Sequence, residues 1–126
     1  MTDPRKQAYQ SYVREIADRM GLKDWRITIE DKPPENPNSQ ASIWMAYGQR
    51  LARLYLSEAF LNESPEERRD TIVHELVHLH LAPANDIAGE SMPAAVKPAY
   101  ERMFEYAVDA LTKCICPAIP LPSIGA

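Results

Sequence analysis

The apolar and polar positions of the chain repeat with two different periods, which divide it into helices and strands. Over residues 4–20 the apolar side chains recur three and four positions apart, and this spacing predicts an amphipathic helix that Gly21 ends. Apolar and polar residues alternate over residues 25–30, 40–47 and 50–57. That alternation predicts three half-buried strands. We expect a small, mostly antiparallel sheet in which the stretch Ala52–Ser57 forms an exposed edge.

A second helix has a clear start signal. Ser64 is followed by Pro65 and, three positions after the serine, by Glu67, which is the pattern of an N-cap with a capping box. The residue before a proline is disfavoured in a helix, so we predict a helix from Pro65 to Leu81 that ends before Pro83.

The last periodic segment predicts a helix that begins near Ala95 or Lys97 and ends near Ile115. Residues 83–96 would then connect the two helices as a loop, and residues 117–126 would form a proline-rich tail. The apolar stripe of this helix consists of Tyr100, Met103, Phe104, Ala107, Val108, Leu111 and Ile115.

Length and composition narrow the class of protein. The chain has 126 residues, of which 45% are hydrophobic and 25% are charged. From this length and composition we predict one globular α+β domain over residues 1–116. A net charge of -4 gives no support to nucleic-acid binding. Residues 1–20 are amphipathic rather than typical of a signal peptide, and no apolar run approaches membrane-spanning length. We therefore expect action in the cytoplasm, without a membrane partner.

The most specific chemical pattern is His74-Glu75-Leu76-Val77-His78, an HExxH motif. Residues four apart lie on the same face of a helix, so both imidazoles can bind one metal ion. Glu75 lies next to them around the helix, where it can accept a proton from a metal-bound water without being a ligand. The alternative is an amphipathic helix whose histidines only border the core.

A site of this kind needs a third protein ligand. The third histidine, His80, lies on nearly the opposite side of its helix from His78. The C-terminal helix carries Glu101, Glu105 and Asp109 at four-residue spacing, so a carboxylate from this row is the simplest third ligand. A solvated acidic face is the alternative interpretation of such a row.

The chain has two cysteines, Cys114 and Cys116, in a C-x-C arrangement. This spacing is unfavourable for a disulfide within a helix, and by itself it is a weak metal signal. We expect two small apolar side chains at the end of a helix, with a ligand role as the second possibility.

These motifs and their order resemble the zincin metallopeptidases, in particular the glutamate-ligand branch and the very small zincins of bacteriophage and bacterial genomes. Residues 105–109 match the E-x-x-x-D arrangement of that branch, and residues 118–122 match the Pro/Leu-rich end of the small members. The resemblance covers roughly residues 50–122. It implies a zincin-like α+β fold with an N-terminal helix, a three-stranded sheet, an HExxH helix and an acidic C-terminal helix. For a phage-encoded chain, the cytoplasm would be that of the host cell.

Carried over to this sequence, the resemblance implies that His74, His78 and Glu105 bind Zn²⁺. It also implies that Glu75 is the general base and that Asp109 orients a ligand histidine. The expected activity is therefore zinc-dependent hydrolysis of a peptide or protein substrate, extended along the edge strand.

Two points stay open at this stage. On a helical wheel Glu101 lies closer to the apolar stripe than Glu105, so it remains the alternative third ligand. No motif marks the side chain that stabilises the oxyanion in larger zincins; Tyr47, Tyr55, Tyr100 and His80 are the candidates.

Two other functions fit the same motif. The first is a non-catalytic zinc-binding domain that recognises a protein partner, in which the metal serves stability alone. The second is a metallohydrolase that acts on a nonpeptide bond or on a protein bound to DNA. The glutamate after the first histidine argues against the former, because a structural site needs no base.

Overall fold

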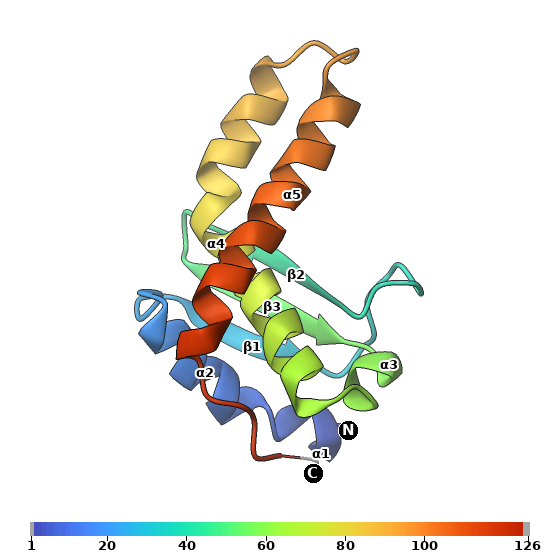
Figure 1. Ribbon diagram of the computed structural model, residues 1–126, viewed down its shortest axis with the longest axis vertical. Helices are drawn as coiled ribbons and strands as arrows, with labels where there is room; N and C mark the ends of the chain where they lie inside the picture. Colours follow the sequence, from blue (N-terminus) through green and yellow to red (C-terminus); the bar gives the residue numbers. More distant parts are fainter. Residues whose placement is uncertain (1, 125–126) are drawn as a thin grey trace.

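The computed structural model describes residues 2–124 as an α+β arrangement in which helices cover one face of a three-stranded mixed sheet (Figure 1). Among these residues no helix is both long and apolar enough to cross a membrane. The elements are α1 (Pro4–Gln7), α2 (Gln10–Arg19), β1 (Arg26–Glu30), β2 (Ala41–Ala46), β3 (Leu51–Leu56), α3 (Glu58–Leu61), α4 (Pro65–Ser91), α5 (Lys97–Ile115) and the 3-10 turn η1 (Cys116–Ala118).

The N-terminal helix is divided into two pieces, where the periodicity predicted one. Helix α1 is a short turn capped by Asp3, whose side chain accepts from the backbone N–H of Arg5. Ala8 and Tyr9 separate α1 from α2. Gly21 follows α2 with a φ of 78°, as expected of a glycine that ends a helix in the left-handed conformation.

The sheet has the strand order β1-β3-β2, with β1 parallel and β2 antiparallel to β3. The expectation of a mostly antiparallel sheet is therefore wrong: one of the two pairings is parallel. The tight connection at residues 47–50 makes β2 and β3 a hairpin, which needs antiparallel pairing. The longer segment 31–40 lets β1 lie on the far side of β3 instead of beside β2.

This order places β3 in the centre of the sheet, so the expectation that residues 52–57 form an exposed edge is also wrong. The predicted faces of β3 are confirmed, because Ala52, Leu54 and Leu56 are fully buried. Strand β2 is the edge strand on the side of α4. Any partner that extends the sheet beside α4 must therefore pair with β2.

The core lies between the sheet and the helices α2 and α4. The inward side chains of α2 are Val13, Ile16 and Ala17, and all three are fully buried. On α4, Ile72 and Leu76 are fully buried in the same cluster. The opposite face of the sheet carries exposed groups, and there the Arg53 guanidinium lies 4.8 Å from the centre of the Trp44 ring.

Helix α4 begins where the sequence predicts. The Ser64 hydroxyl accepts from the N–H of Glu67 at 3.1 Å, and the Glu67 carboxylate accepts from the N–H of Ser64 at 3.4 Å. The helix does not end before Pro83, however, but continues through it to Ser91. The prediction of an end at Leu81 is wrong, because proline disfavours a helix without forbidding one.

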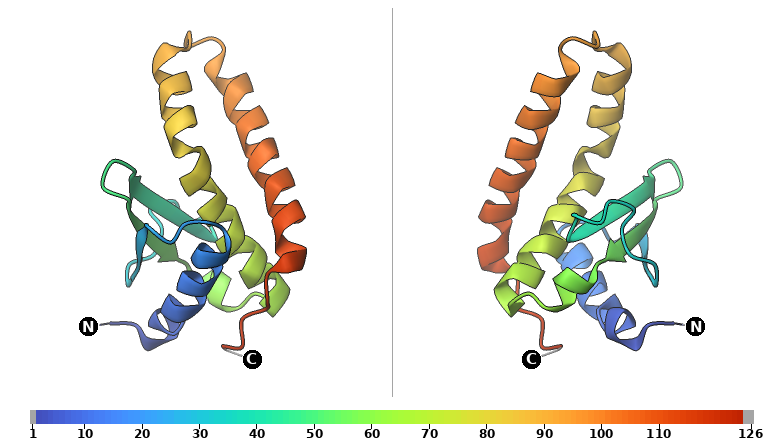
Figure 2. Two further views of the ribbon diagram at one scale, coloured as in Figure 1. Left: turned by 90° about the vertical axis from the view of Figure 1, so that its left-hand side faces the viewer. Right: turned by 90° about the vertical axis from the view of Figure 1, so that its right-hand side faces the viewer.

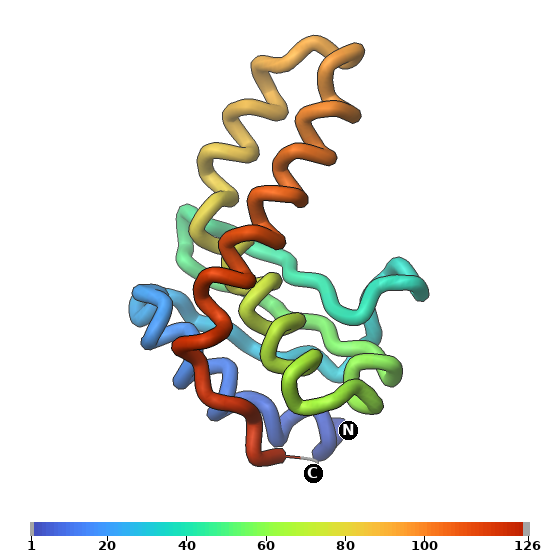
Figure 3. The backbone as a smooth tube through the Cα atoms, viewed as in Figure 1, coloured from blue at the N-terminus to red at the C-terminus, as the bar shows by residue number. Residues whose placement is uncertain are grey.

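The predicted loop over residues 83–96 is accordingly reduced to the short link between α4 and α5. These two helices form a hairpin that extends well beyond the sheet (Figure 2). After Pro83 no residue of α4 is buried, and Asn85, Ala88 and Gly89 are half-buried along one side of the helix. The contact between α4 and α5 therefore supports this part of α4 without forming a core there. The path of the tube shows the same hairpin, with the strands behind its lower half (Figure 3).

The segment after α5 packs against the N-terminal helices. Ile119 is buried in the core cluster, and the Tyr12 hydroxyl donates to the carbonyl of Pro120 at 2.7 Å. The buried guanidinium of Arg68 donates to the carbonyl of Ile124 at 2.7 Å and to the hydroxyl of Tyr9. These contacts hold the C-terminal end of α5 close to the base of α4.

The continuous path of α4 through Pro83 leads to a stability prediction. Substitution Pro83→Ala adds a backbone N–H at an interior helical position and removes the ring that crowds the preceding turn. We expect the free energy of unfolding to rise by about 1–3 kcal/mol in urea denaturation. The matched control is Pro93→Ala in the link between the helices, which should give no gain. Equal or lower stability of Pro83→Ala would mean that the helix ends at this residue.

Candidate metal centre

Burial of one side of α4 determines which of its side chains face α5 and β2. Val73 and Leu76 are fully buried toward the core. Since an α-helix turns by 3.6 residues, His74 and His78 then lie one above the other on the side that faces α5 and β2. The HExxH motif therefore opens into the space between these two elements.

Helix α5 brings one carboxylate to both histidines. Oε2 of Glu105 lies 3.5 Å from Nε2 of His74, and Oε1 of the same residue lies 3.4 Å from Nε2 of His78. One ligand atom from each of the three side chains can be chosen so that all lie within 4.8 Å of one another. The three side chains therefore form a group that can hold one metal ion.

Asp109 lies behind this group and contacts the other nitrogen of His74. Its Oδ1 is 3.0 Å from Nδ1 of His74, a hydrogen-bonding distance. A proton held on Nδ1 by this carboxylate leaves the lone pair of neutral His74 on Nε2, the atom that faces Glu105. The contact fixes both the ring orientation and the tautomer that a metal ligand needs.

Burial favours the metal-binding form of His78 as well. It lowers the pKa of this imidazole, with repulsion by His74 acting in the same direction and attraction by Glu105 opposing it. A neutral imidazole has a free lone pair, whereas the protonated form has none.

Glu75 is placed differently from the three grouped side chains. It lines the same cleft, but it is only 9% exposed and is not a member of the metal-binding group. Burial, followed by repulsion from Glu105, raises its pKa to about 8. A cation bound by Glu105 would offset that repulsion and favour the carboxylate form, which can accept a proton.

The other candidate ligands lie outside the group. Glu101 is exposed and lines a separate depression between the distal parts of α4 and α5. Nε2 of His80 points away and lies 2.6 Å from the carbonyl oxygen of Met20. Neither cysteine belongs to the group: Cys114 is exposed, and the burial of Cys116 raises its thiol pKa to about 12, which disfavours the metal-binding thiolate.

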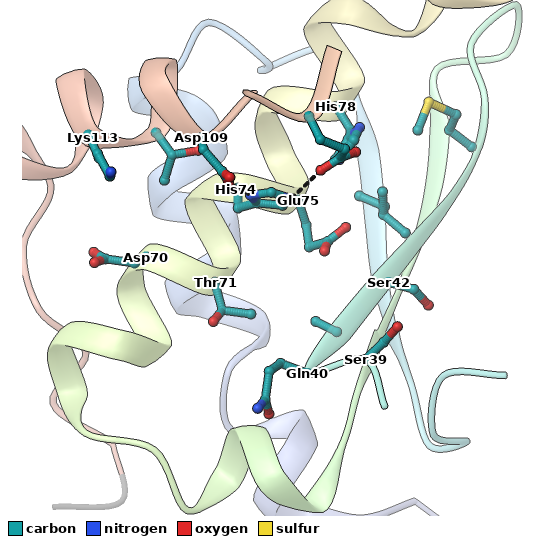
Figure 4. A pocket seen from close by; sticks show the side chains of 15 residues that line it. Ser39, Gln40, Ser42, Asp70, Thr71, His74, Glu75, His78, Asp109 and Lys113 are labelled. Atoms are coloured by element: carbon teal, nitrogen blue, oxygen red, sulfur yellow. Dashed lines mark ion pairs between the residues drawn. The ribbon is translucent and has the colours of Figure 1, made fainter. Parts of the chain in front are cut away.

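The group opens into a cleft of about 680 Å³ between β2, α4 and α5 (Figure 4). None of the expected oxyanion donors, Tyr47, Tyr55, Tyr100 or His80, lines it. Its polar side chains come instead from the start of β2, from the first half of α4 and from the end of α5. They include Ser39, Gln40, Ser42, Asp70, Thr71, Thr112 and Lys113, which no motif in the sequence marks.

No protein-family model matches the chain, and neither the curated proteins nor the solved structures give a significant match. The chemistry that the cleft can support therefore follows from its own geometry. That geometry consists of two imidazole nitrogens, one carboxylate that reaches both, and a second carboxylate behind His74.

Metal content distinguishes the two candidate glutamates. We expect one metal ion per chain in the wild type and its loss in Glu105→Ala, because this substitution removes the carboxylate that contacts both histidines. Glu101→Ala, four residues away on the same helix, is the matched control and should retain the ion. Elemental analysis after dialysis measures both. Retention of metal by Glu105→Ala together with its loss from Glu101→Ala would contradict the placement.

The role of Asp109 is tested by Asp109→Asn, which keeps the shape of the side chain and removes its charge. We expect metal affinity to fall by about 10–100-fold, since groups that orient a ligand histidine typically contribute this much. Competition with a chromogenic chelator measures the affinity. Unchanged affinity would mean that the contact at 3.0 Å does not hold His74 in place.

Proposed function

We propose that the chain is a zinc-dependent metallopeptidase of the zincin type, with His74, His78 and Glu105 as zinc ligands. The observation that carries this proposal is the position of Glu75. It is a buried carboxylate that faces the cleft beside the grouped ligands without being one of them. A purely structural metal site has no use for such a group, whereas hydrolysis needs a proton acceptor there.

The donor set suits zinc. Two imidazole nitrogens and one carboxylate oxygen are common zinc ligands, and three protein ligands leave a coordination position free for water or substrate. Harder ions such as Mg²⁺ and Ca²⁺ prefer a shell of oxygen atoms. When bound, zinc would act as a Lewis acid on the scissile carbonyl and lower the pKa of the attacking water.

The side chains around the metal group have different proposed roles. Glu75 would accept the proton of the attacking water and could pass it to the leaving amine, because its carboxyl group lines the cleft beside the grouped ligands. Asp109 holds the ring of His74, and Glu105 joins α5 to the histidines of α4. The reacting groups are thus fixed by two packed helices rather than by a loop.

The edge of β2 is the part of the cleft best suited to hold a polypeptide. Within residues 2–124 this strand pairs only with β3, and four of its residues line the cleft opposite the metal group: Ala41, Ser42, Ile43 and Met45. An extended segment can add to such an edge through main-chain hydrogen bonds. The cleft is open, so we infer a flexible or unfolded polypeptide as substrate rather than the interior of a folded domain.

The decisive variant is Glu75→Gln, which keeps the size of the side chain and removes its basicity. We expect the zinc content to be unchanged and the hydrolysis of an unfolded protein such as casein to fall by about 10²–10⁴-fold. Release of new amino termini measures the activity, and elemental analysis measures the zinc.

Glu66→Gln, on the exposed first turn of the same helix, is the matched control and should keep full activity. Undiminished hydrolysis by the Glu75→Gln variant would contradict the mechanism. A zinc-loaded wild type that cleaves no polypeptide would favour the non-catalytic binding domain.

A further inference from the structure

Helix α5 continues its row of cleft-facing residues beyond the metal group. Glu105, Asp109 and Lys113 follow one another at four-residue intervals, so they lie along one side of the helix. All three line the same cleft. The close-up shows Lys113 at the end of this row, with its amino group in the space between α5 and the first half of α4 (Figure 4).

Unlike Glu105, Asp109 and Asp70, Lys113 has no ion-pair partner among residues 2–124. Glu105 contacts both histidines, and Asp109 contacts His74. Asp70, across the cleft, forms an ion pair with Arg69 at 3.0 Å. Within residues 2–124, no carboxylate lies within the 4.0 Å of an ion pair from the amino group of Lys113.

The rest of the cleft is unfavourable for a negatively charged ligand. Four carboxylates line it, namely Asp70, Glu75, Glu105 and Asp109, and Lys113 is the only lysine or arginine among the lining residues. A bound divalent metal ion would offset two of these four negative charges, so the cleft would still be acidic away from Lys113. An acidic group of a substrate is therefore repelled along most of the cleft and attracted at one end.

We propose that Lys113 binds a carboxylate of the peptide substrate and so selects where an acidic group stands relative to the scissile bond. This inference rests on the proposed peptidase function. Eight residues separate Glu105 from Lys113, which is about 12 Å along a helix. Helix α5 crosses the direction of β2 (Figure 1), so a peptide that reaches Lys113 leaves the edge of β2 beyond the metal group. An extended peptide covers about 3.3 Å per residue, so the acidic group would stand roughly three or four residues from the scissile bond.

This carboxylate can come from two sources. One is the side chain of an Asp or Glu, and the other is the C-terminus of the peptide. Both present the same acceptor to a lysine ammonium, which acts as a point charge without a fixed orientation. A peptide that ends three or four residues beyond the scissile bond would place its terminus at Lys113. A longer peptide would need an acidic side chain there.

The test separates binding from cleavage by using the zinc-loaded Glu75→Gln protein, which retains the cleft. The probes are fluorescent peptides with amidated C-termini, in which one Glu is moved through an otherwise uncharged sequence. Two reference peptides carry Gln in place of Glu. One has an amidated C-terminus and therefore no carboxylate, and the other has a free C-terminal carboxylate. Fluorescence polarisation measures their affinities with Lys113 intact and in the Glu75→Gln/Lys113→Met protein. The matched control adds Lys23→Met, which removes an exposed lysine outside the cleft.

Lys113 is exposed, so we expect the best-placed Glu peptide, or the free-terminus peptide, to bind about threefold to fivefold more tightly than the amidated Gln peptide, as for an exposed ion pair. That preference should vanish in the Lys113→Met protein and persist in the Lys23→Met control. In a Lys113→Glu protein the preference should reverse, so that a further peptide with Lys at the position of the best-placed Glu binds more tightly than the Glu peptide. A Glu preference identifies a side chain as the source, and a preference for the free carboxylate identifies the terminus.

Persistence of the preference in Lys113→Met would overturn the proposal, as would the absence of any preference or of any peptide binding. A preference that depends on Lys113, in a protein whose wild type cleaves none of the peptides, would support the carboxylate site while refuting the peptidase function. With an active wild type, mass spectrometry of the products should place the acidic group three or four residues from the new end.

Discussion

The apolar side of α4 is the constraint on which the rest of the structure depends. Ile72, Val73 and Leu76 are fully buried against the sheet and α2. Burial of each such side chain contributes roughly 1.5–3 kcal/mol to the free energy of folding. This burial fixes the rotation of the helix about its axis. His74 and His78 are thereby turned toward α5 and the edge of β2, so the same packing that forms the core also orients the two imidazoles.

The parts of the fold that depend on local chemistry could be predicted from the sequence. The capping box at Ser64 and the alternation along β3 are examples, because the neighbouring residues alone determine them. Strand pairing could not be predicted, since nothing in residues 31–40 shows on which side of β3 the first strand lies. The passage of α4 through Pro83 was missed for a related reason: packing against a distant helix overrides a local preference.

The candidate site shows the same division. The four-residue spacing of the histidines was enough to predict that they face one point. The choice between Glu101 and Glu105 was not available from a helical wheel, because it depends on where along α5 the two helices approach each other. In the structure α5 places Glu105 beside the histidines and Glu101 farther along the hairpin. Lys113 carries no motif, and only the tertiary arrangement brings it into the cleft.

We propose that one zinc ion is bound by two imidazoles of α4 and one carboxylate of α5. The X-ray absorption spectrum of the zinc-loaded protein at the zinc edge tests it most directly. We predict a first shell of nitrogen and oxygen atoms at about 2.0–2.2 Å, with the multiple-scattering pattern of two imidazoles. A shell containing sulfur at about 2.3 Å would contradict the account, because it would mean that a cysteine completes the site.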